Sequence, residues 1–209
     1  MADQLYLSLW FPNFRLASLP EKLTAVLQQF GKVSGNTRIA VASTIPLAWS
    51  ESPTFQRIFV NDDRSEQTDD SLPQNAVAEA TEQLHDDMAY EFEAKWQLWQ
   101  PEAAGDEFES TWRLQPATVK FAGFGPDFDD SSYEQNGHIR IDFGLDTPWV
   151  QDESELDEDG QKCLQQNVEK LLAFTLSVEK HCGISSRLLW TESGEPLAEK
   201  LIARLQRVN

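Results

Sequence analysis

The sequence predicts an α+β fold whose first half is a ferredoxin-like split βαβ sandwich. Three observations support this prediction: apolar residues alternate in short runs, two segments between these runs show helical spacing, and both helical segments begin with the same Ser-Leu-Pro box. The expected order over residues 1–100 is β-α-β-β-α-β, with both helices on one face of a four-stranded antiparallel sheet. Residues 111–209 follow as β-β-β-α-β-α, either as a second α+β unit or as a continuation of the same sheet in one domain.

The first predicted strand comes from the alternation of Leu5, Leu7, Leu9 and Phe11, and three further runs of the same kind follow in the first half. On the last of these runs the opposite face is polar, so we expect that face to be solvated. The three further runs are Ile39 to Val41, Phe55 to Val60 and Tyr90 to Leu98.

Each predicted helix of the first half begins at a serine that fits a capping box. Ser18-Leu19-Pro20-Glu21 recurs as Ser71-Leu72-Pro73-Gln74, which places an acceptor at the N-cap and a Glu or Gln three residues later. We expect the first helix to stop at Gly31, because glycine readily takes the left-handed C-terminal cap. The apolar stripes are Leu19, Leu23, Val26, Leu27 and Phe30 in the first helix, and Leu72, Val77, Ala80 and Leu84 in the second.

The second half begins after a polar linker at 100–110. We expect strands at 111–115 and 118–124, separated by Pro116, because proline cannot donate to a strand ladder. The remaining predicted elements are a strand at 138–143, a long helix at 161–182 that stops at Gly183, a strand at 186–191 and a last helix at 196–208.

The charge balance limits the classes of partner. The 209 residues include 17 basic and 35 acidic side chains, a formal net charge of −18. Duplex nucleic acid and anionic membranes attract clusters of Lys and Arg, so the sequence predicts neither as a partner. No apolar run is long enough for a signal sequence or a membrane span, and two cysteines are too few for a disulfide scaffold. We therefore expect a cytoplasmic protein with reduced thiols.

The acidic residues are concentrated in one segment. Residues 61–110 contain 15 acidic and 2 basic side chains, whereas residues 1–60 carry a slight positive surplus. Such a field accelerates association with a cationic surface. The leading hypothesis is therefore a non-catalytic binding or protein-interaction module with an acidic flank and a basic protein partner. An acidic nucleic-acid mimic is a lesser alternative, and charge that serves only solubility needs no partner.

The alternative of another class is a carboxylate-based, metal-assisted or metal-free hydrolase or lyase. Its candidate catalytic residues are Asp127, Asp129, Asp130, His138 and Asp142, which lie in and after the loop Phe121-Ala-Gly-Phe-Gly-Pro-Asp-Phe-Asp-Asp. Such groups supply acid-base chemistry only if they converge within hydrogen-bond reach. Aspartates in loops also commonly cap turns, which is the competing interpretation.

No pattern predicts a resident metal or cofactor. The Gly123-x-Gly125 pair precedes Pro126 and a polar loop rather than a helix, so it favours a bend or tight turn over a phosphate cradle. The run from Glu155 to Gly160 follows an EF-hand register at its start but has Gln166 at the position of the bidentate glutamate.

Two tryptophans are candidate binding residues because they fall in predicted loops beside prolines. Trp49 and Trp149 could stack on a ligand or partner, or could close the end of the sheet over the core. The sequence leaves the oligomeric state open.

Overall fold

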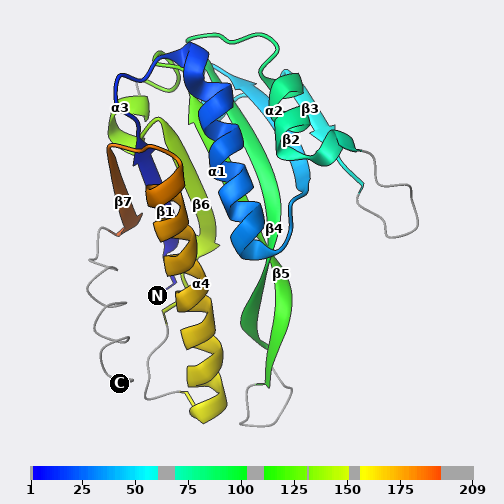
Figure 1. Ribbon diagram of the computed structural model, residues 1–209, viewed down its shortest axis with the longest axis vertical. Coiled ribbons are helices and arrows are strands. Elements are labelled where there is room, and N and C mark those ends of the chain that lie inside the picture. Colours follow the sequence, from blue (N-terminus) through cyan, green and yellow to red (C-terminus); the bar gives the residue numbers. More distant parts are fainter. Residues whose placement is uncertain (1, 61–68, 103–110, 131, 151–155, 194–209) are drawn as a thin grey trace.

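The computed structural model describes residues 2–60, 69–102, 111–130, 132–150 and 156–193 (Figure 1). The last predicted helix, at 196–208, lies outside this part of the chain. The helices and strands are β1 (Gln4–Trp10), α1 (Leu19–Ser34), β2 (Ile39–Pro46), β3 (Phe55–Ile58), α2 (Pro73–Ala80), β4 (Met88–Glu102), β5 (Thr111–Phe124), α3 (Ser132–Asn136), β6 (Ile139–Leu145), α4 (Glu158–His181) and β7 (Ser186–Thr191).

The described strands form one antiparallel sheet in the order β3-β2-β4-β5-β6-β1-β7. The α+β class is thus confirmed. The ferredoxin-like topology is not, because β1 lies between β6 and β7 and is separated from β4 by two strands. A ferredoxin-like sandwich would require the first four strands to pair among themselves. Strands from 1–100 and from 111–209 instead share a single sheet.

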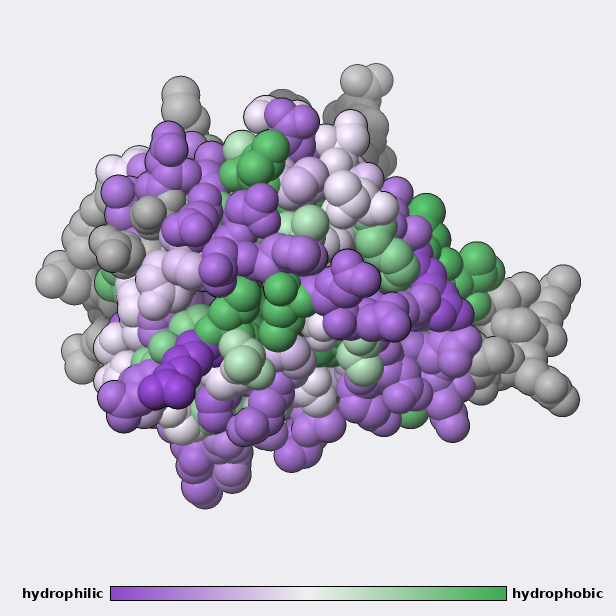
Figure 2. Space-filling view, turned by 90° about the horizontal axis from the view of Figure 1, so that it is seen from above, coloured by the Kyte–Doolittle hydropathy of each residue, from purple (hydrophilic) through white to green (hydrophobic). Residues whose placement is uncertain are grey.

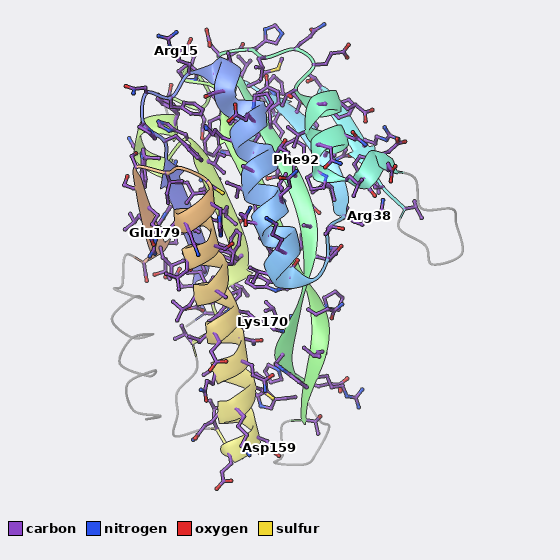
Figure 3. All side chains as sticks on the ribbon, in the orientation of Figure 1. Arg15, Arg38, Phe92, Asp159, Lys170 and Glu179 are labelled. Atoms are coloured by element: carbon purple, nitrogen blue, oxygen red, sulfur yellow. The ribbon has the colours of Figure 1, made fainter. Side chains whose placement is uncertain are left out.

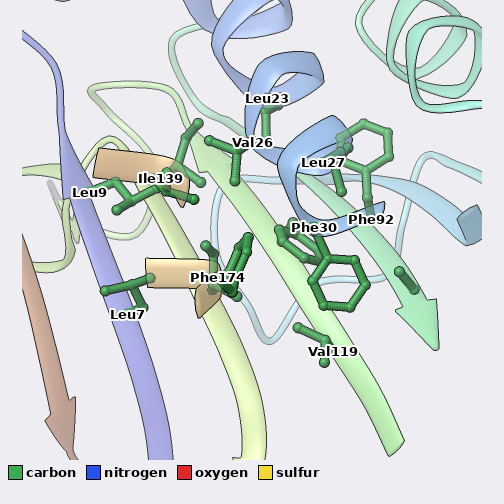
Figure 4. Packing of buried hydrophobic residues seen from close by; sticks show 14 of the residues in the cluster. Leu7, Leu9, Leu23, Val26, Leu27, Phe30, Phe92, Val119, Ile139 and Phe174 are labelled. Atoms are coloured by element: carbon green, nitrogen blue, oxygen red, sulfur yellow. The ribbon is translucent and has the colours of Figure 1, made fainter. Parts of the chain in front are cut away.

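Helices α1, α2 and α4 all cover the same face of the sheet (Figure 1). Phe30 of α1 stands at the centre of the core beneath them, with its ring edge-on to Trp96, Phe121 and Phe174 at centroid distances of 5.3, 5.0 and 5.5 Å. Edge-to-face pairs of this kind stabilise a core beyond the burial of their area. Figure 4 shows the aliphatic side chains of α1 packed among those of the strands below. The alternating and helical apolar positions predicted from the sequence therefore meet in one core.

Helix α1 begins after Ser18 as predicted, but the end of α1 and the start of α2 differ from the predicted boundaries. Helix α1 continues past Gly31 and ends at Gly35, which has a left-handed φ of 75° and donates its N–H to the Gly31 carbonyl. A Cβ on Gly31 would stand 3.2 Å from Thr37, so Gly31 lets the chain pass close by. Neither capping serine caps its helix: Ser18 donates to the Arg15 carbonyl, and Ser71 accepts from the Arg38 guanidinium.

Strand β5 runs unbroken through Pro116, where the sequence predicted an interruption. Pro116 pairs with Gln97 of β4, whose carbonyl accepts a hydrogen bond from Lys170 of α4. The backbone groups of Gln97 therefore point away from β5, and Pro116 occupies a position where the β4–β5 ladder needs no donor. Proline is tolerated in a strand only at such positions.

Beyond the end of β2, side chains cap the edge of β4 at alternate residues. Asn36 donates to the Lys95 carbonyl, Lys170 donates to the Gln97 carbonyl, and Asn167 bonds both the N–H and the carbonyl of Trp99. Figure 3 shows Lys170 projecting from α4 toward this part of β4. Side-chain groups thus replace the missing neighbour strand, which protects an edge that could otherwise pair with another chain.

No helix in the described residues is long and apolar enough to cross a membrane. Seen from above, the surface is mainly hydrophilic and its hydrophobic patches are separate from one another (Figure 2).

Candidate functional site

The sheet face opposite α1, α2 and α4 carries charged and aromatic side chains, and at one end Trp49, Phe128 and Tyr133 pack over it. We call this surface the open face. Its side chains are Tyr6, Ser8, Val41, Ser43, Glu91, Glu93, Lys120, Ala122, Arg140, Asp142, Leu188 and Trp190, of which Ser8, Ser43 and Ala122 are buried.

Strand register aligns these residues in two rows that cross the sheet at right angles to the strands. The first row runs Glu93, Lys120, Asp142, Tyr6, Trp190, and the second runs Glu91, Ala122, Arg140, Ser8, Leu188. Side chains directly opposite one another on neighbouring strands are close enough to interact. The five strands β4, β5, β6, β1 and β7 therefore supply side chains to one surface, although β1 and β7 come from distant parts of the chain.

Lys120 connects the two acidic residues of β4. Its ammonium lies 3.3 Å from Glu91 and 3.4 Å from Glu93. Burial raises the pKa of the Glu91 carboxyl, and Lys120 only partly offsets this effect. Burial alone would lower the pKa of Lys120, but the two glutamates outweigh it and raise that pKa above its usual value. The three groups form a local network whose charges depend on one another.

Asp142 holds the middle of the first row. Its carboxylate accepts from the Gln4 amide at 2.6 Å and from the Gly144 N–H at 2.8 Å. Burial raises the pKa of the neighbouring Tyr6 hydroxyl, and the Asp142 charge raises it further. Tyr6 packs on Trp190 with ring centroids 4.6 Å apart, and the Trp190 indole donates to Ser8 at 3.0 Å. The aromatic end of the open face is therefore fixed in position.

Arg140 lies among three aromatic rings. Its guanidinium carbon is 5.3 Å from the ring centres of Tyr6 and Trp49, and 5.5 Å from that of Phe124. These distances are within the range of cation–π attraction. No carboxylate of the described residues forms an ion pair with Arg140. The three rings therefore hold the guanidinium in position.

Trp49, a predicted binding residue, belongs to a small second core at the end of the open face. Its ring stands edge-on to Phe124 and Phe128, at 5.8 and 5.3 Å. Trp149, the other candidate, is fully buried in the main core, and its indole donates to the Asn167 carbonyl. The ring of Trp149 therefore cannot stack on a ligand.

Gly125 brings the turn that holds three of the candidate carboxylates against the start of β4. A Cβ on Gly125 would meet the Asp86 carbonyl oxygen at 2.2 Å, so only glycine fits there. This close approach agrees with the bend predicted for the glycine pair. Asp127 donates its backbone N–H to Asp86, and Asp129 and Asp130 both have left-handed φ angles, of 47° and 50°. These aspartates shape a tight turn.

His138 is enclosed by aromatic side chains. It stacks on Phe14 at 4.1 Å and on Tyr133 at 4.9 Å, and its Nδ1 accepts a hydrogen bond from the Phe11 N–H at 2.9 Å. Burial lowers its pKa to about 4. His138 and Asp142 thus have separate hydrogen-bond partners, and within the described chain no three His, Cys, Asp or Glu side chains gather as a metal site. The hydrolase or lyase hypothesis stays a prediction that no contact favours.

Asp157, from the EF-hand-like run, caps α4. Its carboxylate accepts from the Gly160 N–H at 2.7 Å at the first turn of the helix. An acidic N-cap is favourable to the helix dipole, which accounts for this residue without a metal.

Acidic residues of segment 61–110 form ion pairs on both sides of the sheet. Asp70 and Glu79, near α2 on the helix side, pair with Arg57 of β3. Glu91 and Glu93 lie on the other side of the sheet and share Lys120. These four carboxylates are divided between two faces, and the acidic flank of the whole segment stays a prediction.

Comparisons of this chain with family models, curated proteins and solved structures found no match. Of the residues that define the open face, the sequence predicts Asp142 as a candidate site residue and Glu91 and Glu93 as part of a solvated strand face. The available signal was the polar alternation on the strands, Tyr6 and Ser8 on one run and Arg140 and Asp142 on another.

Proposed function

We propose that this chain is a non-catalytic protein-interaction module that binds a positively charged protein through the open face. The observation that supports this most strongly is Arg140, held by three rings, beside the Tyr6–Trp190 pair. Trp, Tyr and Arg are the residues that most often dominate the energy of protein interfaces. Their ordered arrangement in the unbound chain lowers the entropic cost of association.

The charge supports a protein partner with a net positive charge. The whole chain carries −18, which attracts a cationic partner over long distances and repels nucleic acid. On the open face itself, carboxylates at Glu91, Glu93 and Asp142 alternate with Lys120 and Arg140. A mixed pattern of this kind specifies orientation more than affinity.

We also propose a cytoplasmic location. Cys163 and Cys182 are both free thiols, as a reducing compartment would keep them.

The test is capture of binding proteins from a lysate of the source cells on the immobilised chain, at low and high salt. Arg140→Glu should reduce recovery of the partner at least tenfold, because it removes the guanidinium that the three rings hold in place. Arg113→Glu is the matched control, since Arg113 lies on the exposed β5 end and pairs only with Glu102 among the described residues. Equal recovery by both variants, or recovery that is indifferent to salt, would contradict the proposal.

A further inference from the structure

Among the described strands, β7 has a neighbour on one edge only, and this neighbour is β1. Glu192 donates its N–H to the Gln4 carbonyl, so the position just after β7 is hydrogen-bonded to β1. Because such positions alternate in an antiparallel pair, Arg187, Leu189 and Thr191 direct their backbone groups away from β1. These outward groups have no hydrogen-bond partner in the part of the chain that the structure describes.

Two other exposed edges of the sheet, at β3 and at β4 beyond β2, are protected. Strand β3 has only four residues, and its Arg57 is tied to α2 through Asp70 and Glu79. The edge of β4 beyond β2 is capped by the side chains described above. Short strands and capped edges are the usual means of preventing strand addition. Strand β7 has neither protection.

The side chains of β7 suit an added strand. Leu188 is 52 % exposed and lies next to Trp190 on the side of the open face. The strand has six residues, Ser-Arg-Leu-Leu-Trp-Thr, without proline or glycine. An extended peptide that adds to such an edge gains main-chain hydrogen bonds, and its alternate side chains contact the apolar positions.

The charges around β7 decide between two occupants. A second copy of this chain would bring together two molecules of charge −18. A positively charged segment would instead meet the exposed carboxylate of Glu192 just after β7, and near it Glu179 at the end of α4, which already pairs with Arg187 of β7. We propose that β7 accepts an extended segment of the partner, with alternating apolar and basic residues, as an eighth strand of the sheet. This inference rests on the proposed function and adds the mode of recognition.

The probe for the test is a fluorescent eight-residue peptide in which valine and lysine alternate, measured by anisotropy with the full chain. Arg187→Pro removes one outward N–H and no bond to β1, so the sheet should be retained while strand addition is blocked. Arg187→Ala removes the same side chain and its ion pair with Glu179 but keeps the N–H. We expect at least tenfold weaker binding for Arg187→Pro than for Arg187→Ala. A peptide with proline in place of valine, which keeps the charge, should not bind.

Equal binding by the two variants, or no binding of the valine-lysine peptide to the unchanged chain, would overturn strand addition. If Arg187→Pro does not fold, hydrogen exchange of the unchanged chain decides, since the peptide must slow exchange at the Leu189 and Thr191 amides. A dimer that Arg187→Pro converts to a monomer would show that the occupant is a second copy instead. The proposed function itself fails if Arg140→Glu leaves capture of the lysate partner unchanged, whatever the peptide does.

Discussion

Replacing Asn167 should destabilise the whole molecule, because this fully buried amide holds two separate segments against α4. Its Oδ1 accepts from the Trp99 N–H at 3.0 Å, and its Nδ2 donates to the carbonyls of Trp99 and Pro148, both at 2.8 Å. In Asn167→Ala these three backbone groups lose their partners. An unsatisfied buried group costs roughly 1–3 kcal/mol. Because Trp99 is partly exposed, we take the lower end and expect a loss of about 3 kcal/mol in the free energy of unfolding.

The assay is thermal and urea unfolding of the purified chain. For a chain of this length a loss of about 3 kcal/mol corresponds to a fall in Tm of roughly 6–12 °C. Gln166→Ala is the matched control, since this neighbouring exposed residue accepts a single bond from the Trp99 indole and should cost less than about 1 kcal/mol. An Asn167→Ala variant as stable as Gln166→Ala would refute the assigned role.

The stability of an Asn167→Asp variant, measured as a function of pH, tests the same contacts. The ionised side chain presents only acceptors to the two carbonyls, so stability should be lowest at neutral pH. Protonation restores one donor, so part of the loss should be recovered as the pH falls.

Three further predictions concern the turn, the buried histidine and the open face. Gly125→Ala should cost more than about 2 kcal/mol in urea unfolding, since the new Cβ meets the Asp86 carbonyl; wild-type stability would disprove the close approach. His138 has a folded pKa of about 4 against 6.5 in the unfolded chain, so the unfolded state takes up the proton first and stability should fall as the pH drops through that window. His138→Gln, which keeps an acceptor but does not titrate, should flatten this dependence, and an unchanged slope would exclude the assignment. Lys120→Met should destabilise the chain more at pH 7 than at pH 4, because Glu91 loses its cation while it is ionised; equal losses at both pH values would argue against the network.

Local periodicity predicted the elements well and their partners poorly. The alternation of Leu5, Leu7 and Leu9 identified β1, and all three side chains are buried. The same alternation contains no information about which strand lies beside it, because any apolar face can pair with any other. The assignment of β1 to the neighbours expected in a split βαβ unit therefore depended on chain order alone.

The predicted roles of Pro116 and Gly31 were wrong for a related reason. The sequence predicts a strand end at Pro116, but the cost of proline depends on whether its position must donate, and that follows from the register with β4. It predicts a helix stop at Gly31, but the role of Gly31 is to leave room for Thr37. The role of Pro116 depends on its pairing with β4, and the role of Gly31 depends on the path of the chain after the helix. A local pattern of apolar residues contains neither.

The candidate site was predictable only in part. Asp142 was selected for its charge and does lie on the open face, whereas His138 is enclosed by Phe14 and Tyr133. Polar residues on a strand indicate a solvated face. Only the three-dimensional structure, through the strand register and the turn that holds Trp49, shows that Arg140 stands beside Tyr6 and within reach of Trp49.

The position of β1 in the sheet has a consequence for how the molecule is made. A ribosome releases β1 first, yet both of its neighbours are synthesised much later, β6 from residue 139 and β7 from residue 186, and the Asp3 N–H donates to a carboxylate 143 residues later. Until β6 and β7 have been synthesised, β1 has no strand beside either of its edges. Pairing between such distant segments is slow, and newly made chains are prone to aggregate during the delay. Nascent molecules should therefore depend on chaperones that shield the first strand, and a ribosome stalled before residue 139 should carry a chain that cannot complete its sheet.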